Sequence, residues 1–106
     1  MTRKNLQQLL DDKQTIISKK DPQKNPSKIE YDITYVLNGD KGEIHTLNES
    51  AAFIWSLLDK PQTIEALLQK MAKEFTVSET KLKTDLDAFL TDFIQEGLLE
   101  VVNKKK

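Results

Sequence analysis

Cysteine is absent from the 106 residues of this sequence, and His45 is its only histidine. The lack of cysteine excludes a disulfide framework, a thiolate metal site and a cysteine nucleophile. A single histidine without cysteine does not supply the usual ligand set of a structural zinc site. We therefore expect a cytoplasmic protein without a bound metal or cofactor, because a chain that lacks thiols suits a reducing compartment.

Long apolar runs are also missing. No stretch approaches the roughly 18 apolar residues of a membrane-spanning helix. The N-terminus has three leucines between residues 6 and 10, set among polar residues, and it lacks the apolar core of a signal peptide. The apolar fraction of 38% is enough for one small core, so the sequence favours a single domain that does not bind membranes.

Catalytic motifs do not occur. The sequence contains no Gly-x-Ser-x-Gly elbow and no Gly-Lys-Ser/Thr step of a phosphate-binding loop. Asp85 and Asp87 lie two residues apart on a predicted helix, so they point in different directions and do not pair as general acid and base. The sequence therefore indicates a protein that is not an enzyme.

Charge is distributed unevenly along the chain. Residues 1–28 carry seven basic and three acidic side chains, a net charge of +4, and the last three residues are all lysine. Residues 29–103 hold six lysines and fourteen acidic residues, a net charge of −8. Such a core disfavours nucleic acid and suits a partner of basic character. The alternative interpretation is a solvated acidic surface with solubilising lysines at the ends.

The stretch LNESAAFIWSLLD, residues 47–59, organises the rest of the chain. All but one of the residues from Ala51 to Leu58 are apolar, and a helix that apolar on every side has to be enclosed by other elements. Asn48 is a good N-cap, because its side-chain oxygen can accept a hydrogen bond from a backbone N–H one turn later. The sequence therefore predicts a buried central helix over 49–58.

A hairpin is predicted before this helix. Residues 29–37 alternate between apolar and polar side chains, which predicts one strand whose buried face includes Tyr31 and Tyr35. Residues 38–42 contain two glycines able to adopt positive φ and are typical of a turn. A second short strand, residues 43–47, then leads directly into the helix.

Signals upstream of the hairpin are weaker. The three leucines between residues 6 and 10 favour at most a turn or two of helix, and the β-branched run 15–18 favours a short strand. Residues 19–28 include two prolines and are typical of a loop. We expect 1–28 to be a basic N-terminal segment, 29–102 the main domain and 103–106 a lysine-rich tail.

Two further helices are predicted after the central one. Thr63 and Ser78 are N-cap candidates, and apolar residues recur at spacings of three and four after each of them. Gly97 is typical of a helix C-terminus, and residues 98–102 favour a last extended piece. The predicted class is α+β, with a winged-helix-turn-helix-like fold: a small antiparallel sheet of two to three strands followed by three helices.

A winged-helix module that binds protein or DNA is the alternative function. Its last helix, residues 78–96, would read the DNA groove. This segment holds five acidic residues against two lysines, and it lacks arginine, the commonest reader of guanine. Phosphates would repel such a helix, which argues against nucleic acid as the partner.

Three segments carry a family resemblance: GEIHTLNESAAFIW, LLDKPQTIEALLQKMAKEF and DLDAFLTDFIQEGLL. The first has a Leu-Asn-Glu-Ser-Ala-Ala signature at 47–52, and the third has Asp85, a Phe-Leu pair at 89–90 and a closing Gly-Leu-Leu at 97–99. From about Tyr31 onward the chain resembles the PqqD-like family, the precursor-peptide recognition elements of ribosomally synthesised, post-translationally modified peptides.

The resemblance implies a peptide chaperone without catalytic activity. It would bind the leader segment of a precursor peptide as an additional β-strand. It would then present the peptide to a maturation enzyme such as a radical S-adenosylmethionine enzyme, a peptidase or a cyclase.

The expected peptide-binding residues lie on two predicted elements. They are Glu43, Ile44, His45 and Thr46 on the docking strand, with Lys81, Asp85 and Phe89 across a groove on the last helix. A short strand at a sheet edge can accept an incoming strand, and the acidic last helix would suit basic residues of the peptide. Core packing of Phe89 and solvation of Lys81 and Asp85 are the alternative interpretations.

Overall fold

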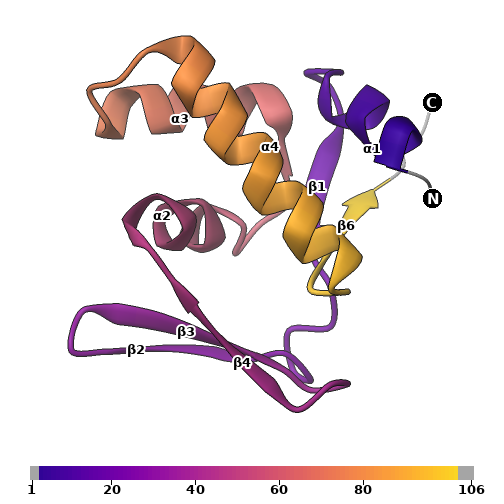
Figure 1. Cartoon of the computed structure of the whole chain (residues 1–106), viewed down its shortest axis with the longest axis vertical. Helices are drawn as coiled ribbons and strands as arrows, with labels where there is room; N and C mark the ends of the chain where they lie inside the picture. The colour runs from indigo at the N-terminus through magenta and orange to yellow at the C-terminus, as the bar shows by residue number, and fades with distance from the viewer. Residues whose placement is uncertain (1–2, 103–106) are drawn as a thin grey trace.

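The structure, a computed structural model, describes the backbone of residues 3–102 and the side chains of residues 6–102 (Figure 1). Its helices are α1 (Arg3–Leu10), α2 (Glu49–Leu57), α3 (Ile64–Glu74) and α4 (Glu79–Gln95). Its strands are β1 (Ile16–Lys19), β2 (Ser27–Glu30), β3 (Ile33–Asn38), β4 (Glu43–Leu47), β5 (Gln62–Thr63) and β6 (Leu99–Val102). None of these helices has both the length and the apolar character needed to cross a membrane.

The strands form two antiparallel sheets. Strands β2-β3-β4 form the sheet that we call the wing sheet, and β5-β1-β6 form a second sheet. In Figure 1 the wing sheet extends to one side of α2, while α3 and α4 lie on the other side. The predicted α+β class, with a small antiparallel sheet followed by three helices, is confirmed.

Helix α2 packs in the core as predicted, but it is not enclosed on every side: within it only Ile54 and Trp55 are buried, and its other apolar residues are partly buried. The Asn48 side chain accepts a hydrogen bond from the Ala51 backbone N–H at 2.8 Å, so the predicted cap is present. Ile54, Trp55 and the following Leu58 are at most 3% exposed. Because α2 contacts β4, α3 and α4, it fixes the positions of all three elements.

The ends of α3 and α4 also agree with the sequence analysis. The hydroxyl groups of Thr63 and Ser78 accept hydrogen bonds from backbone N–H groups three residues later, at 3.0 and 3.2 Å. Gly97 has a φ of +81°, and the next N–H, of Leu98, donates to the Phe93 carbonyl at 2.9 Å. Such a left-handed residue closes the helix and turns the chain back.

The single strand predicted over 29–37 is wrong, because the structure has two strands there. Tyr31 and Asp32 have φ values of 54° and 65°, which make the tight turn between β2 and β3. The apolar alternation continues through the turn, so periodicity alone does not show it. The loop predicted over 19–28 is also too long, because β1 includes Lys19 and β2 begins at Ser27.

The prediction that Tyr31 and Tyr35 lie on a buried face is also wrong. Tyr31 is 91% exposed, and β3 buries Thr34, Val36 and Asn38 instead. Asn38 tolerates burial because its amide nitrogen donates to the Glu96 carbonyl at 3.0 Å, while its amide oxygen accepts from two backbone N–H groups of the following turn. The hydrogen bonds of one asparagine thus help to keep the more apolar face of the strand outside.

The turn after β3 uses its two glycines differently. Gly42 has a φ of +66°, as predicted. Gly39 has no positive φ; it is needed because a Cβ atom there would collide with the Lys24 carbonyl.

Residues 6–19 share the core with the helices. Leu6, Leu10 and Ile17 are at most 3% exposed, and β1 lies between β5 and β6. The Lys19 ammonium lies 2.6 Å from an Asp59 carboxylate oxygen and 4.4 Å from the centre of the Trp55 ring. The boundary predicted after residue 28 falls within β2, and the predicted tail 103–106 lies outside the described residues.

Replacement of a buried α1 leucine tests this shared core. We expect Leu10→Ala, at a fully buried position, to lower the free energy of unfolding by about 2–5 kcal/mol. Chemical denaturation monitored by circular dichroism measures the effect. The matched control Gln8→Ala, at an exposed position of α1, should stay close to wild type. Equal stability of both variants would show that α1 does not contribute to the core.

Candidate functional site

Strand β4 forms an edge of the wing sheet. Within residues 3–102 it pairs with β3 alone, from Leu47 opposite Thr34 to Glu43 opposite Asn38. The side of β4 that faces away from β3 is therefore not paired with another strand of the described chain. The predicted docking strand, residues 43–47, has the same bounds as β4.

The hydrogen bonds of β3 identify which β4 residues face outward. The Leu37 backbone N–H donates to the Pro26 carbonyl at 2.9 Å, so the backbone groups of Leu37 point toward β2. Successive residues of a strand point their backbone groups to alternate sides. His45, opposite Val36, therefore bonds toward β3, whereas Ile44 and Thr46 direct their N–H and C=O groups toward the open edge.

A hollow of about 440 Å³ lies between the end of β4 and α4, and we call it the β4–α4 groove. Its lining comes from β4, the start of α2 and one face of α4. The lining residues are Thr46, Leu47, Asn48, Ser50, Ala51, Lys81, Asp85, Ala88, Phe89, Asp92 and Phe93. Four of the seven predicted binding residues, Thr46, Lys81, Asp85 and Phe89, thus meet around one groove.

The other three predicted residues lie on β4 outside this lining. His45 packs its ring against Phe93, with the ring centres 5.5 Å apart. Ile44 is 67% exposed and lines a separate hollow on the outer face of the wing sheet. Glu43 is exposed at the first position of the strand. Of these three residues, only Ile44 directs its backbone groups toward the open edge.

Aromatic rings form the floor of the groove. The Phe89 and Phe93 ring centres are 4.4 Å apart, and Phe93 also lies 5.7 Å from the Trp55 ring. Phe89 and Phe93 are 9% and 6% exposed, so each packs in the core and presents a small apolar area to the groove. Both interpretations of Phe89, core packing and groove lining, therefore hold.

Carboxylates follow one another along the α4 wall. The Lys81 ammonium lies 2.9 Å from an Asp85 oxygen, which partly neutralises that end of the groove. Asp92 takes part in none of the ion pairs formed among residues 6–102. One turn later, Glu96 lies 3.0 Å from the Lys41 ammonium. The hydrogen bond from Lys41 lowers the pKa of Glu96 below its ordinary value and raises the pKa of Lys41.

Glu43, His45 and Glu96 are the described residues best placed to hold a metal ion. One ligand atom of each lies within 4.8 Å of the others. The His45 Nε2 atom is buried without a hydrogen-bond partner, 3.8 Å from Glu43 and 3.9 Å from Glu96. These three side chains offer fewer ligands than the four of a structural zinc site. Glu96 is also already paired with Lys41.

Several groove residues are missing from the sequence-based set. Asp92 and Phe93 lie three and four residues after Phe89, so helical periodicity could have placed them on the same face. Asn48 and Ser50 were recognisable only as the start of a helix. Their position beside α4 depends on tertiary packing, which the sequence pattern does not show.

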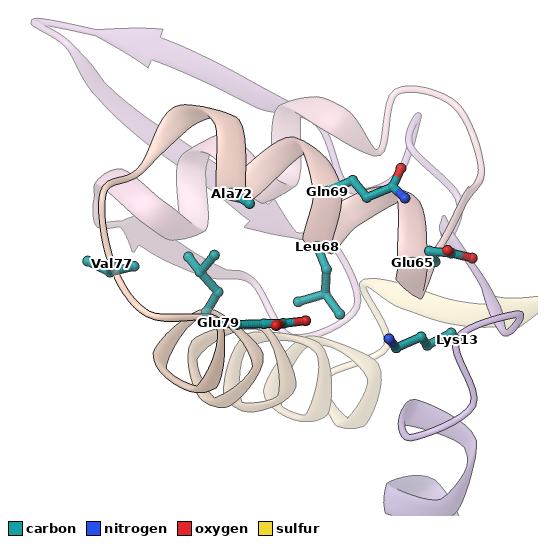
Figure 2. Close-up of a pocket in the computed structure, with 8 residues that line it drawn as sticks. Lys13, Glu65, Leu68, Gln69, Ala72, Val77 and Glu79 are labelled. Carbon is teal, nitrogen blue, oxygen red and sulfur yellow. The ribbon is translucent and has the colours of Figure 1, made fainter.

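A second hollow, of about 430 Å³, lies between α3 and α4. Figure 2 shows Lys13, Glu65 and Glu79 around Leu68, with Val77 at the other end. No strand edge contributes to its lining, so it offers side chains but no row of free backbone groups. The β4–α4 groove is therefore the better candidate for an extended peptide.

A family model and a solved structure are both similar to this chain. The family model of coenzyme PQQ synthesis protein D (PqqD) matches residues 34–99, which include β4, α2 and α4. A solved structure of TbiB1 in complex with the TbiA(beta) leader peptide is similar, with a TM-score of 0.71 and 24% sequence identity. The match covers 82% of this chain and 99% of that chain. No curated protein matches the chain significantly.

The ion pair between Lys41 and Glu96, beyond the end of the groove, gives a test of the electrostatics of this region. In the folded protein the pKa of Glu96 lies below the ordinary value of 4.5. The Lys41–Glu96 pair therefore stabilises the fold above pH 4.5, and this contribution is lost as the pH falls through the pKa of Glu96 in the folded protein. We expect Lys41→Met to raise the pKa of Glu96 toward 4.5. Titration of the carboxyl carbon by NMR measures this.

Lys24→Met is the matched control, because Lys24 pairs with Asp40, 2.8 Å away, and not with Glu96. An unchanged Glu96 pKa in Lys41→Met would show that the pair is absent in solution.

Proposed function

This chain belongs to the PqqD family, and we propose that it binds the leader segment of a ribosomally synthesised precursor peptide and presents it to a modifying enzyme. The peptide lies in the β4–α4 groove as an additional strand beside β4. The observation that carries the proposal is the open β4 edge with a groove wall next to it.

The geometry of the site supports strand addition. Ile44 and Thr46 offer backbone donors and acceptors that any extended peptide can use, which gives affinity without a fixed sequence. The α4 wall, with Phe89 and the neighbouring carboxylates, contacts alternate side chains and gives specificity. The similar structure of TbiB1 is that of a complex with a leader peptide, which fits this mode of use.

The proposed mechanism contains no bond chemistry on this chain. The domain holds the leader, and a maturation enzyme docked beside it encounters the attached core peptide at a raised effective concentration. A radical S-adenosylmethionine enzyme, a peptidase or a cyclase could each act in this way, because the presentation step is independent of the reaction that follows.

Proline at the open edge tests strand addition. Thr46→Pro removes an outward-facing N–H group while leaving the bonds of the neighbouring residues to β3 in place. We expect affinity for a leader peptide to fall roughly two- to tenfold, the loss of about one hydrogen bond. NMR titration of the labelled protein measures the affinity, and its amide spectrum shows whether the fold is intact.

The matched control is Thr46→Val, which keeps the N–H group and the branched shape but removes the hydroxyl. Its affinity should stay close to wild type. If Thr46→Pro folds normally and binds as tightly as Thr46→Val, β4 is not the docking strand.

A further inference from the structure

The α4 wall presents its side chains at a spacing close to that of an extended peptide. Asp85, Phe89 and Asp92 line the groove at intervals of four and three residues, with Glu96 one turn further. At about 1.5 Å per residue, these intervals correspond to roughly 4.5–6 Å along the helix axis. Alternate residues of a strand are separated by roughly 6.6 Å. The step from Asp85 to Phe89 is close to this spacing, and the step from Phe89 to Asp92 is about 2 Å shorter, a difference that a long, flexible lysine or arginine side chain can span.

The two walls of the groove also run along each other. At one end, His45 of β4 lies near Glu96, with 3.9 Å between the imidazole and the carboxylate. Leu47 and Asn48, at the other end of β4, and Lys81, near the start of α4, also line the groove. A peptide that pairs with β4 is therefore guided along α4, past Phe89 and Asp92 in turn.

The charges along this path differ from one step to the next. Asp85 is paired with Lys81, and Glu96 is paired with Lys41. Asp92 lies between these two pairs, exposed and beside the aromatic floor. The residues that line the groove from β4 and the start of α2 carry no formal charge.

We propose that the groove selects leader peptides with an apolar residue and, two residues before or after it, a lysine or arginine. This inference rests on the proposed function. The apolar side chain contacts Phe89 and Ala88. The basic side chain, on the same face of the peptide strand, pairs with the Asp92 carboxylate. The residue between them faces the opposite side of the strand and is not selected by α4.

Three matched synthetic peptides test this pattern. Each has one leucine between threonines and differs in the residues two positions before and after it: lysine, glutamine or glutamate. Because lysine stands on both sides, the first peptide offers one to Asp92 in either strand direction. We expect the lysine peptide to bind roughly two- to fivefold more tightly than the glutamine peptide, the size of an exposed ion pair, and the glutamate peptide to bind most weakly.

Charge removal identifies the responsible residue. Asp92→Asn should reduce the ratio of lysine-peptide to glutamine-peptide affinity to about one. The control Glu74→Gln removes one negative charge at the exposed end of α3, outside the groove lining, and should preserve the ratio. Raising the salt concentration should also reduce the ratio in the wild type, because exposed pairs are screened.

The outcomes separate this inference from the proposed function. Equal affinities for the three peptides, with shifts of the Ile44 and Thr46 amides, would overturn the charge selection and leave strand addition intact. Strand addition needs no particular side chain, so the absence of these amide shifts with all three peptides would contradict the proposed function itself.

Discussion

The burial of α2 is the constraint on which the site depends. An apolar helix has to be covered, and α3 and α4 cover it on one side. Strand β4 runs into α2 with a single intervening residue, Asn48, whose side chain caps the helix. Because no linker separates strand and helix, the position of α2 in the core also sets the distance between the β4 edge and α4. The groove follows from core packing rather than from any local feature of its own residues.

Local signals in the sequence were sufficient to predict the elements around α2. The caps at Asn48, Thr63 and Ser78 and the stop at Gly97 each depend on one side chain or one φ value, and the structure contains all four. The same is true of β4, whose bounds are set by a turn on one side and a cap on the other. Where a boundary depends on local chemistry, the chemistry can be recognised in the residues themselves.

The rest of the wing sheet could not be predicted in the same way from local signals. A pattern of alternating residues does not say which face is turned to the core, and it does not show a turn that keeps the same alternation. Here the buried face carries Val36, in the core, and Asn38, which donates to the distant carbonyl of Glu96. The second sheet was hidden for a related reason, since β1 pairs with β6 across most of the chain. Contacts of that kind join residues that no local window includes.

The charge of α4 illustrates the same limit within the site. Counted along the sequence, this helix is simply acidic, which is enough to disfavour a phosphate backbone as its partner. In the structure its charges are divided between two faces. Asp87 turns toward α1. Its carboxylate accepts hydrogen bonds from Lys83 of α4, at 2.7 Å, and from Gln7 of α1, at 3.0 Å, and it does not line the groove. The groove face carries Asp85, already paired with Lys81, and Asp92. The proposed recognition of a peptide therefore depends on the position of one carboxylate more than on the net charge, and only the fold determines which carboxylate that is.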